Sequence, residues 1–261
     1  MGQRLAGLGI DAGSTTTKIV GVDPDGGLAW HRIEPTNPRM EIQADRLIDA
    51  ANAEAGNGPL PLIATGYGRK LIRRADRAVT EITCHARGVY RQLGHGGTLV
   101  DIGGQDSKVI VMGSDGKVIN FSKNDTCAAG TGRFLEVVAN RLQLSLSEFA
   151  EVAVEATAEV PISSTCTVFA ESELVSLIAR GEPLEQIVRG LLRSLIKRIA
   201  ALARGAGLKP PLMLSGGVAH SRAVRAFLGE ELGHEVLLPN EPQLMGAYGA
   251  ALFALDDGAP A

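Results

Sequence analysis

Two short segments of the sequence carry a carboxylate, a glycine, a hydroxyl and a lysine in the same order and at the same spacing. The first runs from Asp11 to Lys18, and the second runs from Asp101 to Lys108, so that Asp101 follows Asp11 by 90 residues. A glycine in a tight turn lets backbone N–H groups approach phosphate oxygens, and a lysine adds positive charge. A carboxylate at the same turn can hold Mg²⁺ through water. These residue types indicate two phosphate-binding loops with a magnesium ion.

Ordinary β-hairpins are the alternative interpretation of these segments. One Asp-x-Gly turn would favour that alternative, whereas two copies with hydroxyl and lysine in register favour phosphate binding. Neither segment is a P-loop, because Gly-x-x-x-x-Gly-Lys-Ser/Thr is absent. Thr17 is expected to add a hydroxyl donor to the first loop. The candidate phosphate ligands are Gly13, Ser14, Thr15, Thr16, Lys18, Gly103, Gly104 and Lys108.

The repeat continues beyond the loops. Asp25-Gly26 follows the first loop at the same distance as Asp115-Gly116 follows the second. An Asp-Gly pair between apolar runs signals a β-hairpin. We therefore predict that one strand–turn–strand unit is used twice, once in each of two similar halves.

The rest of the chain alternates predicted strands and helices, which is typical of an α/β protein. A strand at 211–215 is expected to run into a tight turn at Gly216 and Gly217. No low-complexity linker is visible, so the boundary between the halves should be a structured crossover near residues 93–97. Helices are predicted at 41–54, 81–93, 129–143, 167–180 and, from the spacing of apolar residues, 184–199.

Composition narrows the class of protein. The chain has 261 residues, of which 45% are apolar and 21% charged, a balance typical of a globular protein with an ample core. Its net charge of −3 lacks the basic excess of a general nucleic-acid binder. No secretory leader is visible, and no apolar run reaches the ~20 residues that span a bilayer. We expect a cytoplasmic protein that binds neither nucleic acid nor membrane.

The three cysteines are Cys84, Cys127 and Cys166, and their odd number argues against a disulfide framework. Cys127 and Cys166 each precede or begin a predicted helix, where the helix dipole stabilises a thiolate. The residues alone leave two interpretations open: inert buried thiols, or metal ligands, which generally come in sets of four. A two-fold dimer would bring four thiolates together, the set that holds an iron–sulfur cluster.

Residues 7–20, 97–111 and 213–221 resemble the phosphate-1, phosphate-2 and adenosine motifs of the actin/Hsp70/sugar-kinase superfamily, in the same order. The resemblance adds Gly216 and Gly217 to the expected nucleotide contacts. It implies a two-domain, actin-like (ribonuclease H-like) α/β fold with duplicated halves and ATP in the cleft between them. It also implies that the last helix packs onto the first half, giving domains of 1–96 plus 242–261 and of 97–241.

A closer resemblance comes from the two cysteine segments, Asn124–Glu136 and Ser163–Glu173, taken with both loops. From residue 8 to residue 255 the chain resembles the activator ATPases of 2-hydroxyacyl-CoA dehydratases. The resemblance implies that Cys127 and Cys166 ligate a 4Fe-4S cluster, one per homodimer. Cys84 fits a family segment that does not bind the cluster. We interpret Cys84 as core or near-nucleotide packing and His85 as a structural histidine.

The resemblance also implies a mechanism in which ATP hydrolysis is coupled to electron transfer. Binding of ATP would reorient the subunits, so that one low-potential electron reaches an acyl-CoA dehydratase or reductase. A ferredoxin or flavodoxin would supply the next electron. Asp11, Asp101 and Gln105 are the candidate catalytic residues, and Asp101 and Gln105 are expected to position the attacking water.

Three alternatives stay open at this point. The ATPase subunits of benzoyl-CoA reductases are close relatives of the activators and share the two cysteines. A sugar-type kinase of the same fold is the second, because Asn124-Asp125 is similar to the pair that carries the general base in some sugar kinases. In those kinases, however, the pair precedes the second phosphate motif. An actin-type filament protein is the third, and it leaves the cysteine segments unexplained.

Overall fold

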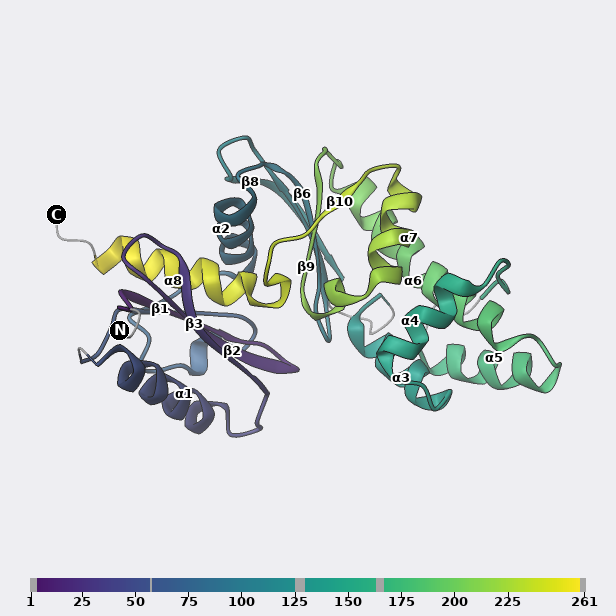
Figure 1. Ribbon diagram of the computed structural model, residues 1–261, viewed down its shortest axis with the longest axis horizontal. Helices are drawn as coiled ribbons and strands as arrows, with labels where there is room; N and C mark the ends of the chain where they lie inside the picture. Colours follow the sequence, from purple (N-terminus) through teal and green to yellow (C-terminus); the bar gives the residue numbers. More distant parts are fainter. Residues whose placement is uncertain (1–3, 57, 125–129, 163–166, 259–261) are drawn as a thin grey trace. The chain divides into compact units, whose positions relative to one another are not determined.

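The computed structural model describes residues 4–56, 58–124, 130–162 and 167–258, and Figure 1 traces their helices and strands. The chain divides into two compact units. The first unit comprises Met1–Gly96, Met112–Val118 and Pro239–Ala261, and the second comprises Gly97–Val111 and Ile119–Leu238. The chain therefore ends in the unit in which it began.

The first unit is built on a five-stranded sheet in the order β3-β2-β1-β4-β5. The pairs β1–β2 and β2–β3 are antiparallel, whereas β4 runs parallel to β1 and β5 runs parallel to β4. The turn between β2 and β3 contains Asp25-Gly26, as the hairpin signal predicted. The strands are β1 (Gly7–Ala12), β2 (Thr16–Val22), β3 (Leu28–Pro35), β4 (Leu62–Thr65) and β5 (Arg77–Ala78).

Helices cover both faces of this sheet (Figure 1). Successive residues of β1 face opposite sides of the sheet. Leu8 and Ile10 belong to a buried cluster with the apolar face of α1 (Met40–Ala55). The intervening Gly7 and Gly9 face α8 (Met245–Gly258) so closely that a Cβ on Gly9 would lie 2.1 Å from Ala247 O. Helix α8 also packs on α2 (Glu81–Leu93). A short 3-10 helix, η1 (Arg69–Leu71), follows β4, and another, η3 (Pro242–Leu244), precedes α8.

The second unit repeats this strand order. Its sheet has the order β10-β9-β6-β7-β8, so its first, second and third strands again lie side by side, with the fourth and fifth on the other edge. The strand β9 runs parallel to β6, as β4 runs to β1. The duplication predicted from the two loops is confirmed at the level of the sheets. The strands are β6 (Gly97–Ile102), β7 (Ser107–Met112), β8 (Val118–Asn124), β9 (Leu212–Ser215) and β10 (Val236–Leu237).

One large hydrophobic core holds the second unit together. Its central element is α6 (Leu184–Gly205), whose buried face runs from Ile187 to Ala203. That face shares the core with strands of the sheet and with the helices around it (Figure 1). The other elements are α3 (Gly132–Arg141), α4 (Leu146–Glu155), α5 (Thr167–Ala179), the 3-10 helix η2 (Gly217–His220) and α7 (Arg222–Leu232).

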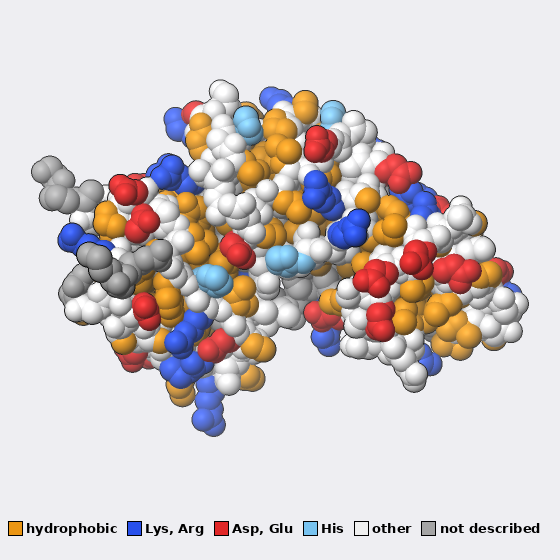
Figure 2. Space-filling view, in the orientation of Figure 1, with side chains coloured by type: hydrophobic (Ala, Val, Ile, Leu, Met, Phe, Trp, Pro, Cys, Tyr) orange, Lys and Arg blue, Asp and Glu red, His pale blue; other side chains and the backbone are white. Residues whose placement is uncertain are grey.

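Charge is distributed unevenly over the second unit. Figure 2 shows acidic side chains gathered over its helical end, where exposed residues include Glu148, Glu151, Glu155, Glu182 and Glu185. Between residues 142 and 188, Arg180 is the only lysine or arginine in the sequence. Among the described residues, none of the helices combines the length and the apolarity that crossing a bilayer requires.

Candidate phosphate-binding loops

The first candidate loop joins β1 to β2, and its charged residues face each other across this hairpin. Asp11 lies opposite Lys18 in the strand register, and Lys18 Nζ is 3.1 Å from Asp11 Oδ2. Only 8% of the Asp11 side chain and 14% of the Lys18 side chain are exposed. The residues between them, Gly13 to Thr16, are half-buried. The loop therefore presents backbone and hydroxyl groups to solvent beside a shielded ion pair.

Three glycines leave room beside this ion pair. A Cβ on Gly66 would lie 2.3 Å from Asp11 Oδ1, and one on Gly13 would lie 3.2 Å from Lys18 Nζ. A Cβ on Gly246, at the start of α8, would lie 3.2 Å from Asp11 Oδ2. Gly66 also has φ +88°, which glycine adopts without strain. Glycine at these positions keeps the space around both charges free of side chains.

Thr17 braces the first loop from the buried side. Its side chain is fully buried, lies 3.2 Å from the hydroxyl of Thr36 and donates to Gln43 Oε1 at 3.3 Å. Thr36 in turn donates its hydroxyl to Gly13 O at 2.8 Å and its N–H to Thr15 O at 2.9 Å. The Thr17 hydroxyl, which was expected to be a phosphate donor, is therefore committed to this brace.

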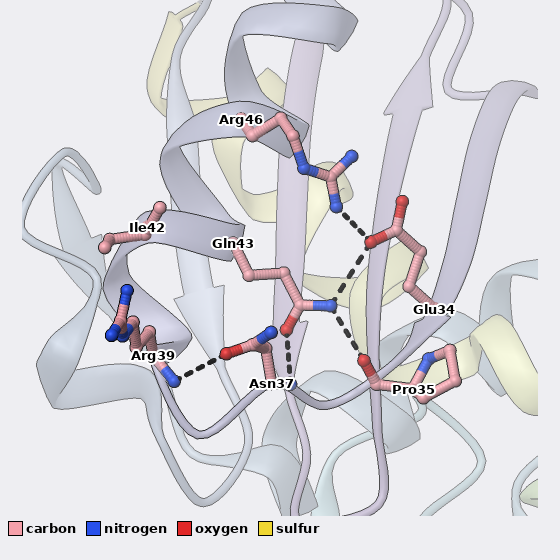
Figure 3. A pocket seen from close by; sticks show the side chains of 7 residues that line it. All are labelled: Glu34, Pro35, Asn37, Arg39, Ile42, Gln43 and Arg46. Carbon is pink, nitrogen blue, oxygen red and sulfur yellow. Dashed lines mark hydrogen bonds and ion pairs between the residues drawn. The ribbon is translucent and has the colours of Figure 1, made fainter.

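A surface pocket of about 400 Å³ lies against this brace (Figure 3). Gln43 accepts a hydrogen bond from the N–H of Asn37 at 2.9 Å and donates to Pro35 O at 2.8 Å. Arg46 donates to Glu34, and this bond lowers the pKa of the Glu34 carboxyl. These bonds hold segment 34–37 against α1, so we interpret the pocket as part of the wall that supports the first loop. The pocket is lined by Glu34, Pro35, Asn37, Arg39, Ile42, Gln43 and Arg46.

The second candidate loop joins β6 to β7 and carries one carboxylate more than the first. Lys108 Nζ lies 3.4 Å from Asp101 Oδ2 and 2.9 Å from an oxygen of Asp106. The side chains of Asp101 and Lys108 are each 3% exposed. Ser215, at the end of β9, donates its hydroxyl to Asp101 Oδ1 at 2.8 Å. Asp106 and Ser215 were not among the predicted site residues.

The extra carboxylate makes the two loops electrostatically different. Asp106 occupies the position that Thr16 holds in the first copy, since both precede their lysine by two residues. The first loop therefore pairs one carboxylate with one lysine, whereas the second pairs two carboxylates with one lysine. A net negative loop favours a cation, and a neutral loop whose lysine is partly exposed is better suited to phosphate. Comparing the two copies residue by residue would have identified Asp106.

Glycines bring the adenosine-motif turn against the second loop. Gly216 has φ +89°, and a Cβ there would lie 2.3 Å from Ile102 O, at the end of β6. Gly217, at the start of η2, is exposed, as is Gln105 in the second loop. The second unit therefore brings together Asp101, Lys108 and the Gly216 turn, with Gln105 open to solvent. Gly103 and Gly104 are half-buried in the loop itself.

Helix α3 begins on the second loop. The N–H of Gly132 donates to Gly103 O, and the N–H of Arg133 donates to Gly104 O, each at 2.9 Å. Ser107 donates its hydroxyl to Gly130 O. Both donors at the start of α3 would otherwise lack partners within the helix. The loop therefore caps the helix that follows the Cys127 segment.

Cys84 and His85 lie inside the first unit, on α2. Burial raises the pKa of the Cys84 thiol to about 12, so the thiol is neutral at physiological pH. His85 Nδ1 lies 2.9 Å from Glu81 O, within its own helix. Both residues pack against glycines of α8, because a Cβ on Gly249 would lie 1.8 Å from Cys84 O and one on Gly246 would lie 2.7 Å from His85 Cε1. Both have the surroundings of core residues.

The predicted cluster ligands, Cys127 and Cys166, lie outside the described residues. Within residues 4–56, 58–124, 130–162 and 167–258, no group of three or more histidine, cysteine or acidic side chains is arranged to hold a metal ion.

Sequence comparison gives the chain a family. The model of the BadF/BadG/BcrA/BcrD ATPase family matches residues 8–254. The (R)-2-hydroxyglutaryl-CoA dehydratase activating ATPase of Acidaminococcus fermentans is 40% identical over 254 residues, covering 95% of this chain and 96% of the relative. The 2-hydroxyisocaproyl-CoA dehydratase activator of Clostridioides difficile is 42% identical over 196 residues, covering 75% and 74%. One of the subunits of the Thauera aromatica benzoyl-CoA reductase is less similar, at 28% identity over 261 residues, covering 95% of this chain and 92% of that relative.

Solved structures agree with the sequence comparison. Component A of the Acidaminococcus fermentans (R)-2-hydroxyglutaryl-CoA dehydratase superposes with a TM-score of 0.90 at 39% identity, covering 97% of this chain and 99% of that one. The Clostridium difficile 2-hydroxyisocaproyl-CoA dehydratase activator, solved with bound ADPNP, gives 0.88 at 36% identity, covering 97% and 95%. A glucokinase from Streptomyces griseus gives 0.60 at 18% identity, covering 97% and 99%, which shows a shared fold alone.

Proposed function

This chain belongs to the BadF/BadG/BcrA/BcrD ATPase family, and we propose that it hydrolyses ATP to deliver a low-potential electron to a 2-hydroxyacyl-CoA dehydratase. The named activators at 40% and 42% identity support the dehydratase as partner. The benzoyl-CoA reductase relative, at 28%, gives weaker support for an aryl-CoA reductase.

The observation that carries the ATPase assignment is the duplicated aspartate–lysine pair at the ends of β1 and β6. Each pair is shielded from solvent, and Gly13, Gly66 and Gly246 leave space beside the first pair. Two such loops on two copies of one sheet are the arrangement that binding a polyphosphate and its counter-ion needs. An ordinary hairpin would need neither buried charges nor this clearance.

The residues of the two loops suggest a separate role for each in ATP hydrolysis. Lys18, with the open hydroxyls and amides of the first loop, would neutralise phosphate charge. Asp11 and Asp101 would hold Mg²⁺ through water, and their carboxylate oxygens are the donors that this ion prefers. Gln105, which is exposed, would orient the attacking water. The proposed nucleotide contacts are Gly13, Ser14, Thr15, Thr16, Lys18, Gly103, Gly104, Lys108, Gly216 and Gly217.

Cys127 and Cys166 are the proposed ligands of a 4Fe-4S cluster shared by two copies of the chain. The support is their place in the sequence, five residues before α3 begins and one residue before α5 begins. A helix N-terminus favours a thiolate at Cys166, which directly precedes α5, and two chains supply the four thiolates that such a cluster takes. When bound, the cluster would supply one-electron chemistry at low potential. A ferredoxin or flavodoxin is the proposed electron donor.

Iron analysis of cysteine variants tests this proposal. Anaerobically purified protein should contain one 4Fe-4S cluster per dimer. Cys127→Ser and Cys166→Ser should each lose the iron, because each change removes two of four thiolates by symmetry. Cys84→Ser is the matched control and should keep the iron, because the buried Cys84 thiol has a pKa of about 12 and stays neutral. Iron retained in both ligand variants, or lost only from the Cys84 variant, would refute the ligand assignment.

A further inference from the structure

The two copies of the repeat use their buried hydroxyl in different ways. Thr17 and Ser107 hold the same position, each directly before its lysine, and both are at most 1% exposed. Thr17 donates to Gln43 Oε1 and lies 3.2 Å from the Thr36 hydroxyl, within the brace of the first loop. Ser107 instead donates to Gly130 O, in the segment that leads into α3. The Thr17 hydroxyl therefore bonds within the support of the first loop, whereas the Ser107 hydroxyl connects the second loop to the segment before α3.

Ser107 makes one of several contacts between the second loop and the start of α3, which we call the loop–α3 joint. The N–H groups of Gly132 and Arg133 donate to Gly103 O and Gly104 O. A Cβ on Gly132 would lie 3.0 Å from Val218 Cγ2, so η2 also packs closely on the start of α3. Gly130, whose carbonyl accepts from Ser107, has φ +103°, a backbone conformation that favours glycine. Residues 130–133 are therefore fastened to both the second loop and the adenosine-motif turn.

Gly103 and Gly104, whose carbonyl oxygens accept these bonds, are also proposed to contact the nucleotide. The carbonyl oxygens of Gly103 and Gly104 accept from α3, while the Gly103 N–H donates to Asp106 O within the loop. A peptide plane that tilts to follow phosphate must move its neighbour's carbonyl as well, because each peptide unit is rigid. The side-chain bond from Ser107, on β7, adds a third link to these two backbone bonds.

We infer that Ser107 is a positioning residue that transmits the nucleotide state of the second loop to residues 130–133, the segment that directly follows the Cys127 region. This inference rests on the proposed ATPase function and concerns how the site is coupled to α3. It predicts that coupling and hydrolysis are separable, because the Ser107 hydroxyl is bonded to Gly130 rather than directed at the loop amides.

Hydrogen–deuterium exchange on iron-free protein tests this inference. The amides of residues 130–135 are followed with Mg·ADP and with Mg·ADPNP, a non-hydrolysable ATP analogue. In the wild-type chain the exchange rates of Gly132 and Arg133 should differ between the two nucleotides by about tenfold, the effect of one buried hydrogen bond. In Ser107→Ala the ratio should fall to about one, and Ser107→Thr should restore it, since the first copy accommodates Thr17.

Thr17→Val is the matched control, because it removes the repeat-related hydroxyl from the first loop. It should keep the wild-type ratio. A wild-type ratio in Ser107→Ala, or an equal loss in Thr17→Val, overturns the inference. If Ser107→Ala does not fold, Gly132→Ala perturbs the same joint by a methyl group and should also lower the ratio; a normal ratio there overturns the inference as well. Failure of the proposed function would appear separately, as wild-type protein without iron or without ATP-driven electron delivery.

Discussion

Lys18 and Lys108 hold matching positions in the repeat, but their surroundings differ, so we expect Lys18 to bind phosphate and Lys108 mainly to stabilise the fold. Lys18 has one carboxylate partner and remains 14% exposed, whereas Lys108 lies between two carboxylates and is 3% exposed. A lysine already paired with two carboxylates has less charge to offer phosphate than Lys18 has. Breaking a buried charge pair also leaves the partner uncompensated.

Substituting Lys18 should therefore mainly weaken nucleotide binding, whereas substituting Lys108 should mainly lower the free energy of unfolding. Lys18→Met should weaken nucleotide binding about tenfold or more, because a hydrogen bond to a charged group contributes about 1.5–3 kcal/mol. Lys108→Met should lower the free energy of unfolding by about 3–5 kcal/mol, more than Lys18→Met does. Calorimetric nucleotide titration and urea unfolding measure the two effects.

Asp106→Asn provides the control for this prediction. Added to Lys108→Met, it should recover part of the lost stability, because it removes one of the two uncompensated carboxylates. Equal losses of stability from both lysine variants, or a larger loss of affinity from Lys108→Met, would contradict the division of roles.

At the residue scale, the sequence identified the repeated aspartate and lysine of both loops but not that each aspartate pairs with its lysine. The spacing of Asp11 with Lys18 and of Asp101 with Lys108 is local, so it can be identified without the fold. Ser215 reaches Asp101 across 114 residues, and the hydroxyl of Thr17 turns to Gln43 on another element. Contacts of that kind depend on tertiary packing, which no local spacing encodes.

At the scale of elements, the close packing of α8 against α2 and β1 requires glycines at the points of contact. A Cβ on Gly249 would lie 1.8 Å from Cys84 O on α2, and one on Gly9 would lie 2.1 Å from Ala247 O. Both obstacles are backbone atoms, which cannot move aside as a flexible side chain can. Helix α8 therefore approaches α2 and β1 to backbone contact.

Gly249→Ala should destabilise the first unit by at least about 1–3 kcal/mol, the typical cost of forcing an extra carbon into a packed core. Chemical denaturation measures the change. Gly205→Ala, at the end of α6, is the matched control, because nothing lies within 4 Å of its added Cβ. It should be neutral or stabilising by up to about 1 kcal/mol. A neutral Gly249→Ala would contradict the close packing.

Periodicity predicted most helices and missed two. The predictions at 81–93 and 167–180 correspond to α2 and α5, and the apolar spacing from Leu184 identified α6, which continues to Gly205. Helices α4 and α7 were not predicted. For α4 a local signal existed, because Ser145 and Glu148 form a capping box at its start. For α7 the signal was a single capping serine, Ser221, which is weak without its packing partners.

At the scale of the whole molecule, the duplicated sheet explains why one chain carries two loops. The order β3-β2-β1-β4-β5 recurs as β8-β7-β6-β9-β10, and the α8 segment returns the chain to the first unit. The sequence predicted this duplication because hairpin register is fixed over short distances. The joint between the second loop and α3 was not predicted, because it links backbone groups 29 residues apart, Gly103 and Gly132.

The central claim is that ATP gates electron delivery, and one measurement tests it most directly. Reduced, iron-loaded protein is mixed with a 2-hydroxyacyl-CoA dehydratase component, and the rate of electron delivery is compared with Mg·ATP, with Mg·ADP and without nucleotide. A shift of the delivering state from 1:99 to 99:1 needs about 5.5 kcal/mol of preference for one arrangement. We predict rapid delivery with ATP and at most slow delivery in the other two conditions. Equal rates in all three would contradict the account and favour a kinase of the same fold.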